Sequence, residues 1–332
     1  MLLIPEIRAP GLVRKRVESI CLYGTFKANE IPRGRLVISF PMRTLLLTLA
    51  FGTLTTLSAW SAPLRVLLLD GQNNHDWKSS SPWLKKILEE TGLFAVDVAT
   101  TPPAGGDMAS FKPDLSPYQV LVSNYNGQPW SKEFQQAFVT YVRAGGGFVS
   151  VHAADNAFPE WTEYNEMIGI GGWNGRNQSS GPWLYWDGKI VRDPAPGTGG
   201  SHGKQHEFKL VTREPSHPIM AGLPAEWMHG KDELYDRLRG PAKNITVLAT
   251  AFSDKATNGS GRHEPLLMVL TFGQGRIFHT ALGHNNGPDL TAQKCVGFIA
   301  TLQRGTEWAA TGQVTQRPPV DFPTADKSSY RH

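Results

Sequence analysis

The sequence predicts an α/β protein built on a doubly wound, mostly parallel sheet. Short apolar runs of strand length alternate with segments whose apolar residues recur at helical spacing. Glycine or proline separates many of these segments, and polar residues follow several of the apolar runs directly. In open sheets of this kind, ligands bind just beyond the carboxyl ends of the strands, so these polar residues are the first candidates for a site.

The clearest unit spans residues 131–155. It begins with a helical pattern that Ser131 is expected to cap, continues through three glycines that end the helix, and reaches a short apolar strand at 148–151. His152 and Asp155 follow that strand, so we expect them at the ligand-binding rim, with Asp155 reaching back to fix the imidazole. The alternative is that His152 is a hydrogen-bonded structural histidine.

The other elements follow from the same patterns. Strands are expected at 64–69, 94–98, 118–123, 206–212 and 245–250, a hairpin at 266–282, and helices from Ser81 to Gly92 and over 290–303. Residues 156–205 break the alternation as a long, aromatic-rich loop insertion with four tryptophans. We expect this loop to cover the rim and to contact ligand through Trp173 or Trp183, the alternative being plain packing.

The N-terminal segment is expected to lie outside the folded domain. Residues 1–41 show no periodic pattern and are predicted to be a non-native extension ahead of a true start at Met42. Residues 42–62 combine a basic start, an apolar core and small residues at the end, which is typical of a secretory signal peptide. The α/β domain then covers residues 63–310, and residues 311–332 are expected to form an extended tail.

The basic character of the chain lies in its N-terminal segment. Residues 1–43 contain eight lysines and arginines and three acids, and the whole chain has a formal net charge of +4. Residues 44–332 therefore carry −1, and nothing predicts nucleic-acid binding. Of the two cysteines only Cys295 follows the signal peptide, so no intramolecular disulfide is expected, and its apolar neighbours predict a core position. We expect no membrane contact after the signal peptide is cleaved. Formation of a homo-oligomer is left open by the sequence.

Histidine, carboxylate and amide side chains recur at the predicted strand ends, whereas no cysteine follows a predicted strand. Three uses stay open: acid–base chemistry, a divalent metal such as zinc, and sugar binding by tryptophan faces and polar side chains. No HxH or HExxH spacing occurs, so metal ligands would have to come from separate loops.

The candidate residues fall into three overlapping groups. The catalytic candidates are His152, Asp155, Glu233 and His284. The metal-ligand candidates are His152, His206, Glu233 and His284. The substrate-binding candidates are His75, Asp76, Asn124, Asn126, Trp173, Trp183, His206, Tyr235 and Asn285.

Four segments in this order resemble the ThuA-like proteins, a family named after a trehalose-utilisation protein. They are GGGFVSVHAA at 145–154, HPIMAGLP at 217–224, DELY at 232–235 and GRIFHTALGH at 275–284. The resemblance spans about residues 64–305 and implies a flavodoxin-like sheet similar to that of class I glutamine amidotransferases. Those enzymes carry a nucleophilic cysteine where this chain has His152, so the resemblance excludes cysteine-dependent amidotransfer.

The resemblance also implies a carbohydrate-related function, since the family is associated with disaccharide use and with 3-keto sugars. We therefore expect an exported carbohydrate-processing enzyme that binds a small sugar or glycoside. Its reaction would be acid–base or metal-assisted cleavage or isomerisation of an oxidised (3-keto) glycoside or disaccharide, which places it among hydrolases, lyases or isomerases. The alternatives are a non-catalytic carbohydrate-binding protein of the same fold, and a structural or complex-forming module.

Overall fold

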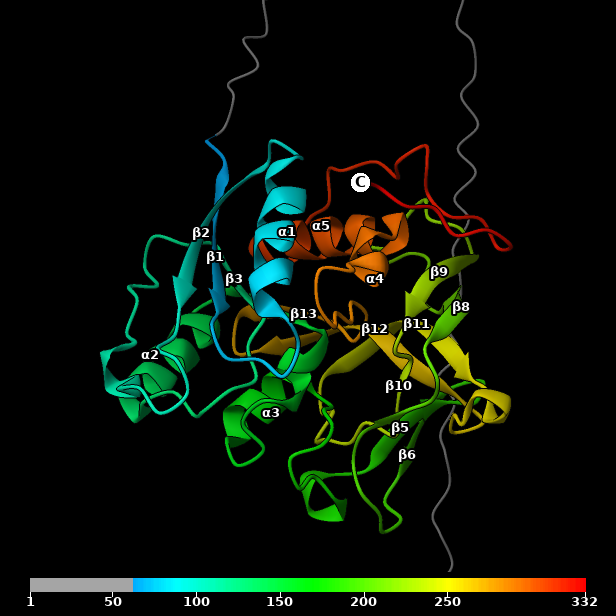
Figure 1. Cartoon of the computed structure of the whole chain (residues 1–332), viewed down its shortest axis with the longest axis horizontal. Coiled ribbons are helices and arrows are strands. Elements are labelled where there is room, and N and C mark those ends of the chain that lie inside the picture. Colours follow the sequence, from blue (N-terminus) through cyan, green and yellow to red (C-terminus); the bar gives the residue numbers. More distant parts are fainter. Residues whose placement is uncertain (1–61) are drawn as a thin grey trace, which may run out of the picture. The chain divides into compact units, whose positions relative to one another are not determined.

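The computed structural model describes residues 62–332, so the predicted extension and nearly all of the predicted signal peptide lie outside the described residues. One 11-stranded sheet runs through this part of the chain, with helices packed against it (Figure 1). The strand order is β2-β1-β3-β4-β13-β12-β11-β8-β9, and the short strands β5 (Trp183–Trp186) and β6 (Ile190–Asp193) attach beside β12. No helix within residues 62–332 has both the length and the apolar character that crossing a bilayer requires.

The first half of the sheet is parallel. Its strands are β1 (Leu64–Asp70), β2 (Phe94–Thr100), β3 (Val120–Ser123), β4 (Gly147–Val151) and β13 (Gly275–Thr280). Every residue of β3 and β4 is buried, as expected of strands covered on both faces. The chain steps outward from β1 to β2 on one side and from β3 to β4 on the other, which makes the β1/β3 boundary a topological switch point. The predicted α/β fold with a mostly parallel core is confirmed.

The second half of the sheet is antiparallel. Its strands are β8 (His206–Thr212), β9 (Glu226–Asp232), β11 (Ile245–Ser253) and β12 (Arg262–Phe272), and β12 pairs with β13 as the predicted hairpin. The strands predicted at 206–212 and 245–250 are present. Strand β9 was not predicted, because its polar and apolar residues do not alternate regularly.

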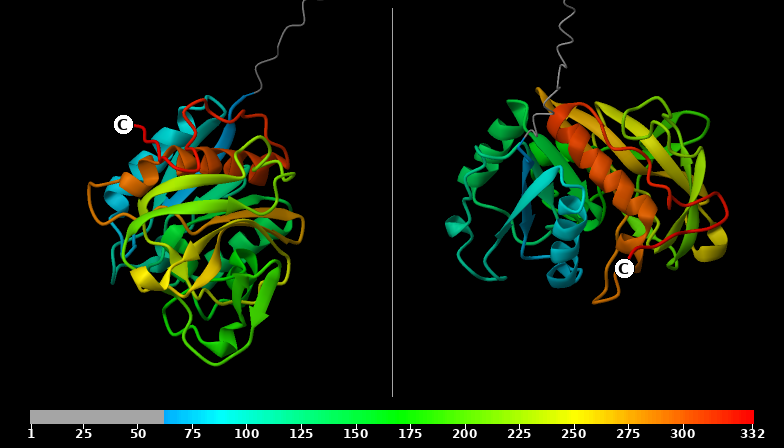
Figure 2. Two further views of the ribbon diagram at one scale, coloured as in Figure 1. Left: turned by 90° about the vertical axis from the view of Figure 1, so that its right-hand side faces the viewer. Right: turned by 90° about the horizontal axis from the view of Figure 1, so that it is seen from above.

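Helices pack on both faces of the sheet. α1 (Trp77–Glu89) and α5 (Val296–Thr311) share one face, where Gln303 Nε2 donates to the Ile87 carbonyl at 2.6 Å. α2 (Lys132–Arg143) and α3 (Thr162–Ile168) share the other, and their Phe138 and Tyr164 rings lie 6.5 Å apart. Figure 2 shows α5 crossing the sheet as a single long helix, preceded by the short α4 (Thr291–Lys294).

The predicted start of α2 is confirmed, whereas the predicted start of α1 is wrong. Ser131 Oγ accepts from Phe134 N at 3.2 Å, which confirms the predicted cap of α2. α1 does not begin at Ser81. Asp76 caps it by accepting from Ser79 N, so Pro82 lies inside the helix instead of in its first turn.

The aromatic-rich insertion at 156–205 has more structure than the sequence predicted. It contains α3, β5, β6 and the two-residue strand β7 (Ser201–His202), which pairs with β10 (Tyr235–Asp236) as a small separate sheet. Trp161 is 7% exposed and packs among the rings of Trp130 and Tyr164, so this tryptophan belongs to the core.

The C-terminal tail that follows α5 contains no further helix or strand and lies against the domain. The Thr324 carbonyl accepts from Met228 N of the edge strand β9 at 2.8 Å, and the Ser329 carbonyl accepts from Val296 N at 2.9 Å. Such contacts cover a sheet edge that would otherwise offer unpaired backbone groups. Cys295 is fully buried beside this tail, as its apolar neighbours predicted.

Candidate active site

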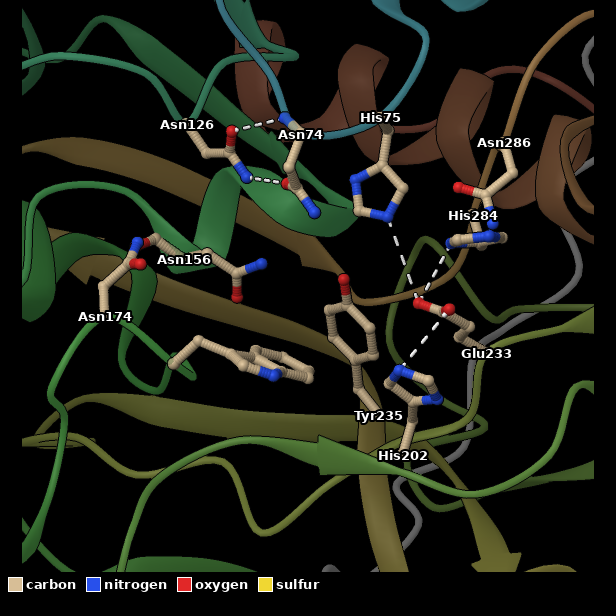
Figure 3. Close-up of a pocket in the computed structure, with 11 residues that line it drawn as sticks. Asn74, His75, Asn126, Asn156, Asn174, His202, Glu233, Tyr235, His284 and Asn286 are labelled. Carbon is tan, nitrogen blue, oxygen red and sulfur yellow. Dashed lines mark hydrogen bonds and ion pairs between the residues drawn. The ribbon is translucent and has the colours of Figure 1, made fainter.

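A cavity of about 350 Å³ opens at the carboxyl ends of the parallel strands. His75 follows β1, Asn126 follows β3 and His284 follows β13, so strands that point the same way bring three distant segments to one rim. Figure 3 shows the side chains that surround the cavity. They are Asn74, His75, Asn126, Asn156, Trp173, Asn174, His202, Glu233, Tyr235, His284 and Asn286.

His152 lies beneath this cavity in a strained turn. It ends β4 and starts a 3₁₀ helix, η2 (His152–Asn156), with a backbone φ of 47°. A non-glycine residue in this left-handed region destabilises the folded state by about 1–3 kcal/mol. Such strain is found mainly at functional sites, where the backbone conformation orients a side chain. Its Nδ1 donates to the Ala281 carbonyl at 2.8 Å, so Nε2 keeps its lone pair. The turn directs Nε2 to within 3.8 Å of Glu233 Oε2.

Glu233 is the centre on which three imidazoles converge. Its Oε2 lies 2.9 Å from His284 Nδ1, 3.8 Å from His152 Nε2 and 4.0 Å from His75 Nε2. One donor atom from each of these four side chains lies within 4.8 Å of the others. Figure 3 shows Glu233 between His75, His284 and His202, whose Nε2 faces the other carboxylate oxygen at 3.5 Å. The cluster can transfer protons, and its three nitrogens and one oxygen could also hold a divalent cation.

Asp232 fixes the two loops that deliver Glu233 and His284. Its carboxylate accepts from four donors: Glu233 N at 2.7 Å, Gly283 N at 2.8 Å, His284 N at 3.0 Å and His229 Nε2 at 2.8 Å. Gly283 has a φ of 110°, and a Cβ there would lie 2.7 Å from the Phe298 ring, so only glycine allows the chain to turn here. The end of β9 and the segment after β13 are therefore tied to one buried carboxylate.

Burial and mutual charge set the protonation states in the cluster. Burial, together with the neighbouring His152 and His284, lowers the pKa of His75 to about 3. Burial also lowers the pKa of His152. Burial alone would raise the pKa of Glu233, but the hydrogen bond with His284 and the nearby histidines outweigh it and lower that pKa. At neutral pH, His75 is therefore a neutral imidazole facing an ionised carboxylate.

Aromatic and amide side chains form the remaining wall. The rings of Trp173 and Tyr235 lie 4.6 Å apart, and Tyr235 in turn stacks on His152 at 4.3 Å. Burial, together with the charges of Asp155 and Glu233, raises the pKa of Tyr235 well above its ordinary value, so its hydroxyl stays a donor. Five asparagines complete the lining. None of the described residues that line this cavity is a lysine or an arginine.

The structure brings together many of the sequence candidates. His152 lies at the floor, and His75, Asn126, Trp173, Glu233, Tyr235 and His284 line the cavity. Three neighbouring candidates act as supports. Asp76 caps α1, Asn124 Nδ2 donates to Ser80 and Ser81, and Asn285 Nδ2 donates to the Asp76 carbonyl.

Three candidates lie elsewhere. Asp155 does not hold His152 as expected: its Oδ2 pairs with His279 Nε2 at 3.2 Å, and the Ala281 carbonyl orients His152 instead. His206 is outside the cavity, with Nδ1 bonded to the Lys204 carbonyl, and His75 takes its place in the cluster. Trp183 also lies outside the cavity, where the Arg239 guanidinium covers its ring at 4.4 Å.

Sequence reasoning did not single out five of the lining residues: Asn74, Asn156, Asn174, His202 and Asn286. Asn74 and Asn286 adjoin predicted site residues, so a wider window around each strand end would have included them. His202 gave no usable signal, because only the pairing of His202 in β7 with Tyr235 in β10 places it at the cavity.

Comparisons with known proteins agree with this architecture. The chain matches the family model ThuA, described as trehalose utilisation, over residues 65–309. The solved structure of a ThuA-like protein from Parabacteroides merdae is 53% identical with a TM-score of 0.80, covering 81% of this chain and 98% of that one. A ThuA-like protein from Bacteroides uniformis, at 17% identity and a TM-score of 0.50, covers 78% and 96% and shows likeness of fold alone. No curated protein matches the chain. The resemblance seen in the four sequence motifs is confirmed, and the chain belongs to the ThuA family.

Proposed function

We propose that this protein is a carbohydrate-processing enzyme that cleaves or isomerises an oxidised (3-keto) glycoside or disaccharide by acid–base chemistry. Membership of the ThuA family implies a carbohydrate-related function. The observation that carries the proposal is the union, in one cavity, of an imidazole–carboxylate cluster with an aromatic and asparagine-rich wall.

The wall is suited to a neutral sugar. Pyranose rings present apolar C–H faces that stack on aromatic side chains, and Trp173 and Tyr235 supply such faces. Asparagine amides each offer donors and an acceptor, which matches hydroxyl groups that both donate and accept. None of the described lining residues is a lysine or an arginine, so none offers the charge-assisted hydrogen bonds by which these side chains bind a phosphate or carboxylate.

A 3-keto group makes the chemistry possible without an enzyme nucleophile. The C2–H bond next to the C3 carbonyl is acidic, so a base can remove that proton and leave an enolate. The enolate electrons then form the C1–C2 double bond and break the C1–O bond, and an acid protonates the departing alcohol. The products are an unsaturated keto sugar and the free alcohol, and no oxidant or water is consumed. Return of the proton to the opposite face of C2 would instead isomerise the sugar.

The cluster contains groups of the right kind for these roles. Glu233, ionised at neutral pH, is the proposed base that accepts the C2 proton. Tyr235 keeps its proton, and its hydroxyl, shown in Figure 3 among the cavity side chains, is the proposed donor to the sugar oxygens. His202, beside Glu233, lies where it can pass a proton to or from the carboxylate.

The test is release of p-nitrophenol from p-nitrophenyl 3-keto-glucosides of both anomeric forms. The wild type should release it, whereas Glu233→Gln should be slower by about 10²–10⁴-fold. His206→Gln is the matched control, because this histidine lies outside the cavity, and it should retain full activity. The unoxidised glucosides should be inert, since their C2–H is not acidic.

The alternative of a non-catalytic binding protein gives a different result. Sugar binding by the wild type with no p-nitrophenol release from either keto-glucoside, and no exchange of the C2 hydrogen with solvent, would reject the enzyme and favour the binding protein.

A further inference from the structure

We propose that His75, His152, His284 and Glu233 bind a divalent transition metal ion of the zinc class at the floor of the cavity. The ion would supply the group that polarises the substrate carbonyl. Glu233 would bind it through Oε2, which leaves Oε1, 3.5 Å from His202 Nε2, as the oxygen that acts as base. Its part in the reaction rests on the proposed function, whereas its binding rests only on the four side chains.

The separations between the donor atoms fit a single ion. Zinc bonds of about 2.0–2.2 Å to nitrogen and oxygen place tetrahedral donors about 3.3–3.6 Å apart. The distances from Glu233 Oε2 to the nitrogens of His284, His152 and His75 are 2.9, 3.8 and 4.0 Å, which bracket that range. Small rotations of these side chains would therefore complete a four-coordinate site.

Two of the three histidines are oriented as metal ligands are. The Ala281 carbonyl accepts from His152 Nδ1 at 2.8 Å, and Asn73 Oδ1 lies 3.2 Å from His75 Nδ1. In both residues the outer nitrogen is engaged and the Nε2 lone pair faces the cluster, which is the pattern by which supporting groups fix metal-binding imidazoles. Among the described residues His152 Nε2 has no hydrogen-bond partner, although it is buried. A buried polar atom without a hydrogen-bond partner destabilises the folded protein unless a bound ligand interacts with it.

The residue types indicate which ion would bind. Three imidazole nitrogens and one carboxylate oxygen suit zinc and neighbouring transition metals, whereas calcium and magnesium prefer sites built from oxygen. The positions of the four ligands also explain why the sequence contains no recognisable metal-binding motif. The ligands follow β1, β4, β13 and β9, so no two lie within one short motif.

The position is accessible from the cavity. His75, Glu233 and His284 all line it, so an ion held by them would meet a bound sugar, unlike a structural zinc closed off by protein. Such an ion acts as a Lewis acid on a carbonyl oxygen.

The test is zinc binding by the full chain, prepared without a tag and freed of metal with a chelator. Titration with Zn²⁺ against a chromophoric chelator should show one tight site per chain. His75→Gln, His284→Gln and Glu233→Gln should each weaken binding by at least about 100-fold, more than loss of a supporting partner does. His206→Gln, the matched control outside the cavity, should bind as the wild type does. A folded, metal-free wild type that takes up no zinc, or equal affinities for His75→Gln and His206→Gln, would overturn the inference.

A second measurement does not depend on how the variants fold. Co²⁺ bound to the wild type should give the intense visible absorption of a four- or five-coordinate site, and the weak absorption of an octahedral ion would contradict the proposed ligand set. Neither assay contains sugar, so zinc binding without keto-glucoside turnover would reject the proposed function alone. Turnover that persists in the chelator-treated protein would reject the metal's part in the reaction and leave the proposed function standing.

Discussion

Trp173 and Trp183 both belong to the insertion, yet only one of them lines the cavity. Trp173 packs beside Tyr235, whereas Trp183 donates from Nε1 to the Thr198 carbonyl and lies under Arg239. Trp173→Ala should weaken sugar binding by about 0.5–1.5 kcal/mol, the usual worth of a stacking contact beyond area burial. Trp183→Ala should leave affinity unchanged. Calorimetric titration with a neutral disaccharide checks both, and equal affinities would show that Trp173 only packs the loop.

Glu264 gives the stability of the protein a distinct pH dependence. It is 2% exposed, and burial raises its pKa from 4.5 to about 7. The folded chain therefore binds this proton more tightly than the unfolded chain does. As pH rises from about 4.5 to about 7 the free energy of unfolding should fall, by up to about 3 kcal/mol from this group. Glu264→Gln cannot titrate and should lose less stability between pH 5 and pH 8 in urea denaturation. Parallel losses in the two proteins would contradict this assignment.

Helices and strands that are stabilised by interactions within one short segment could be predicted from the sequence. The cap at Ser131 and the apolar face of its helix lie within a dozen residues, so α2 could be read from the sequence. Contacts between side chains of different elements could not be predicted in this way. His279 is 124 residues from Asp155, and nothing in either segment shows that this carboxylate turns away from His152. His75 replaces His206 in the cluster for the same reason, since only the sheet order brings the ends of β1 and β4 together.

Asp232 is the link between two of the elements that build the cluster, because it ties the backbone after β9 to the backbone after β13. Asp232→Asn replaces one carboxylate oxygen with an amide nitrogen that cannot accept, so two of the four donors lose their acceptor and the loops of Glu233 and His284 should loosen. Zinc affinity should fall by about 10–100-fold, as for other supporting partners. Asp236→Asn is the matched control: this aspartate is also fully buried, but it pairs with Arg237 and Ser253.

The readout separates positioning from mere stability. Both variants should lower the melting temperature, whereas only Asp232→Asn should lower zinc affinity. If the two variants bind zinc equally well, Asp232 is structural and does not position the ligands.

At the scale of the whole molecule, the two halves of the sheet contribute different parts of the site. The parallel half supplies the three histidines of the cluster, and the antiparallel half, together with the insertion, supplies Glu233 and the aromatic wall. The sequence predicted the histidine rim, since parallel strands end together. It named Glu233 and Tyr235 but could not place them opposite the rim. Their position depends on the pairing of β7 with β10 and on the hydrogen bonds from the backbone after β13 to Asp232, which no local pattern shows.

We also propose that the protein is exported, on the basis of the signal-peptide pattern at 42–62. When the gene is expressed in a Gram-negative host, mass spectrometry of the periplasmic protein should find a mature N-terminus near Pro63. A mature protein that begins upstream of Met42 would contradict this proposal.

In the proposed reaction, the imidazole–carboxylate cluster removes the proton next to a sugar carbonyl. The most direct measurement is exchange of the C2 hydrogen of methyl 3-keto-glucoside in D₂O, followed by proton NMR with wild-type protein and with Glu233→Gln. The wild type should accelerate loss of the C2 signal and the variant should be slower by about 10²–10⁴-fold, because proton removal precedes both cleavage and isomerisation. A wild type that binds this sugar yet exchanges its C2 hydrogen no faster than buffer would show that the cluster does not remove this proton.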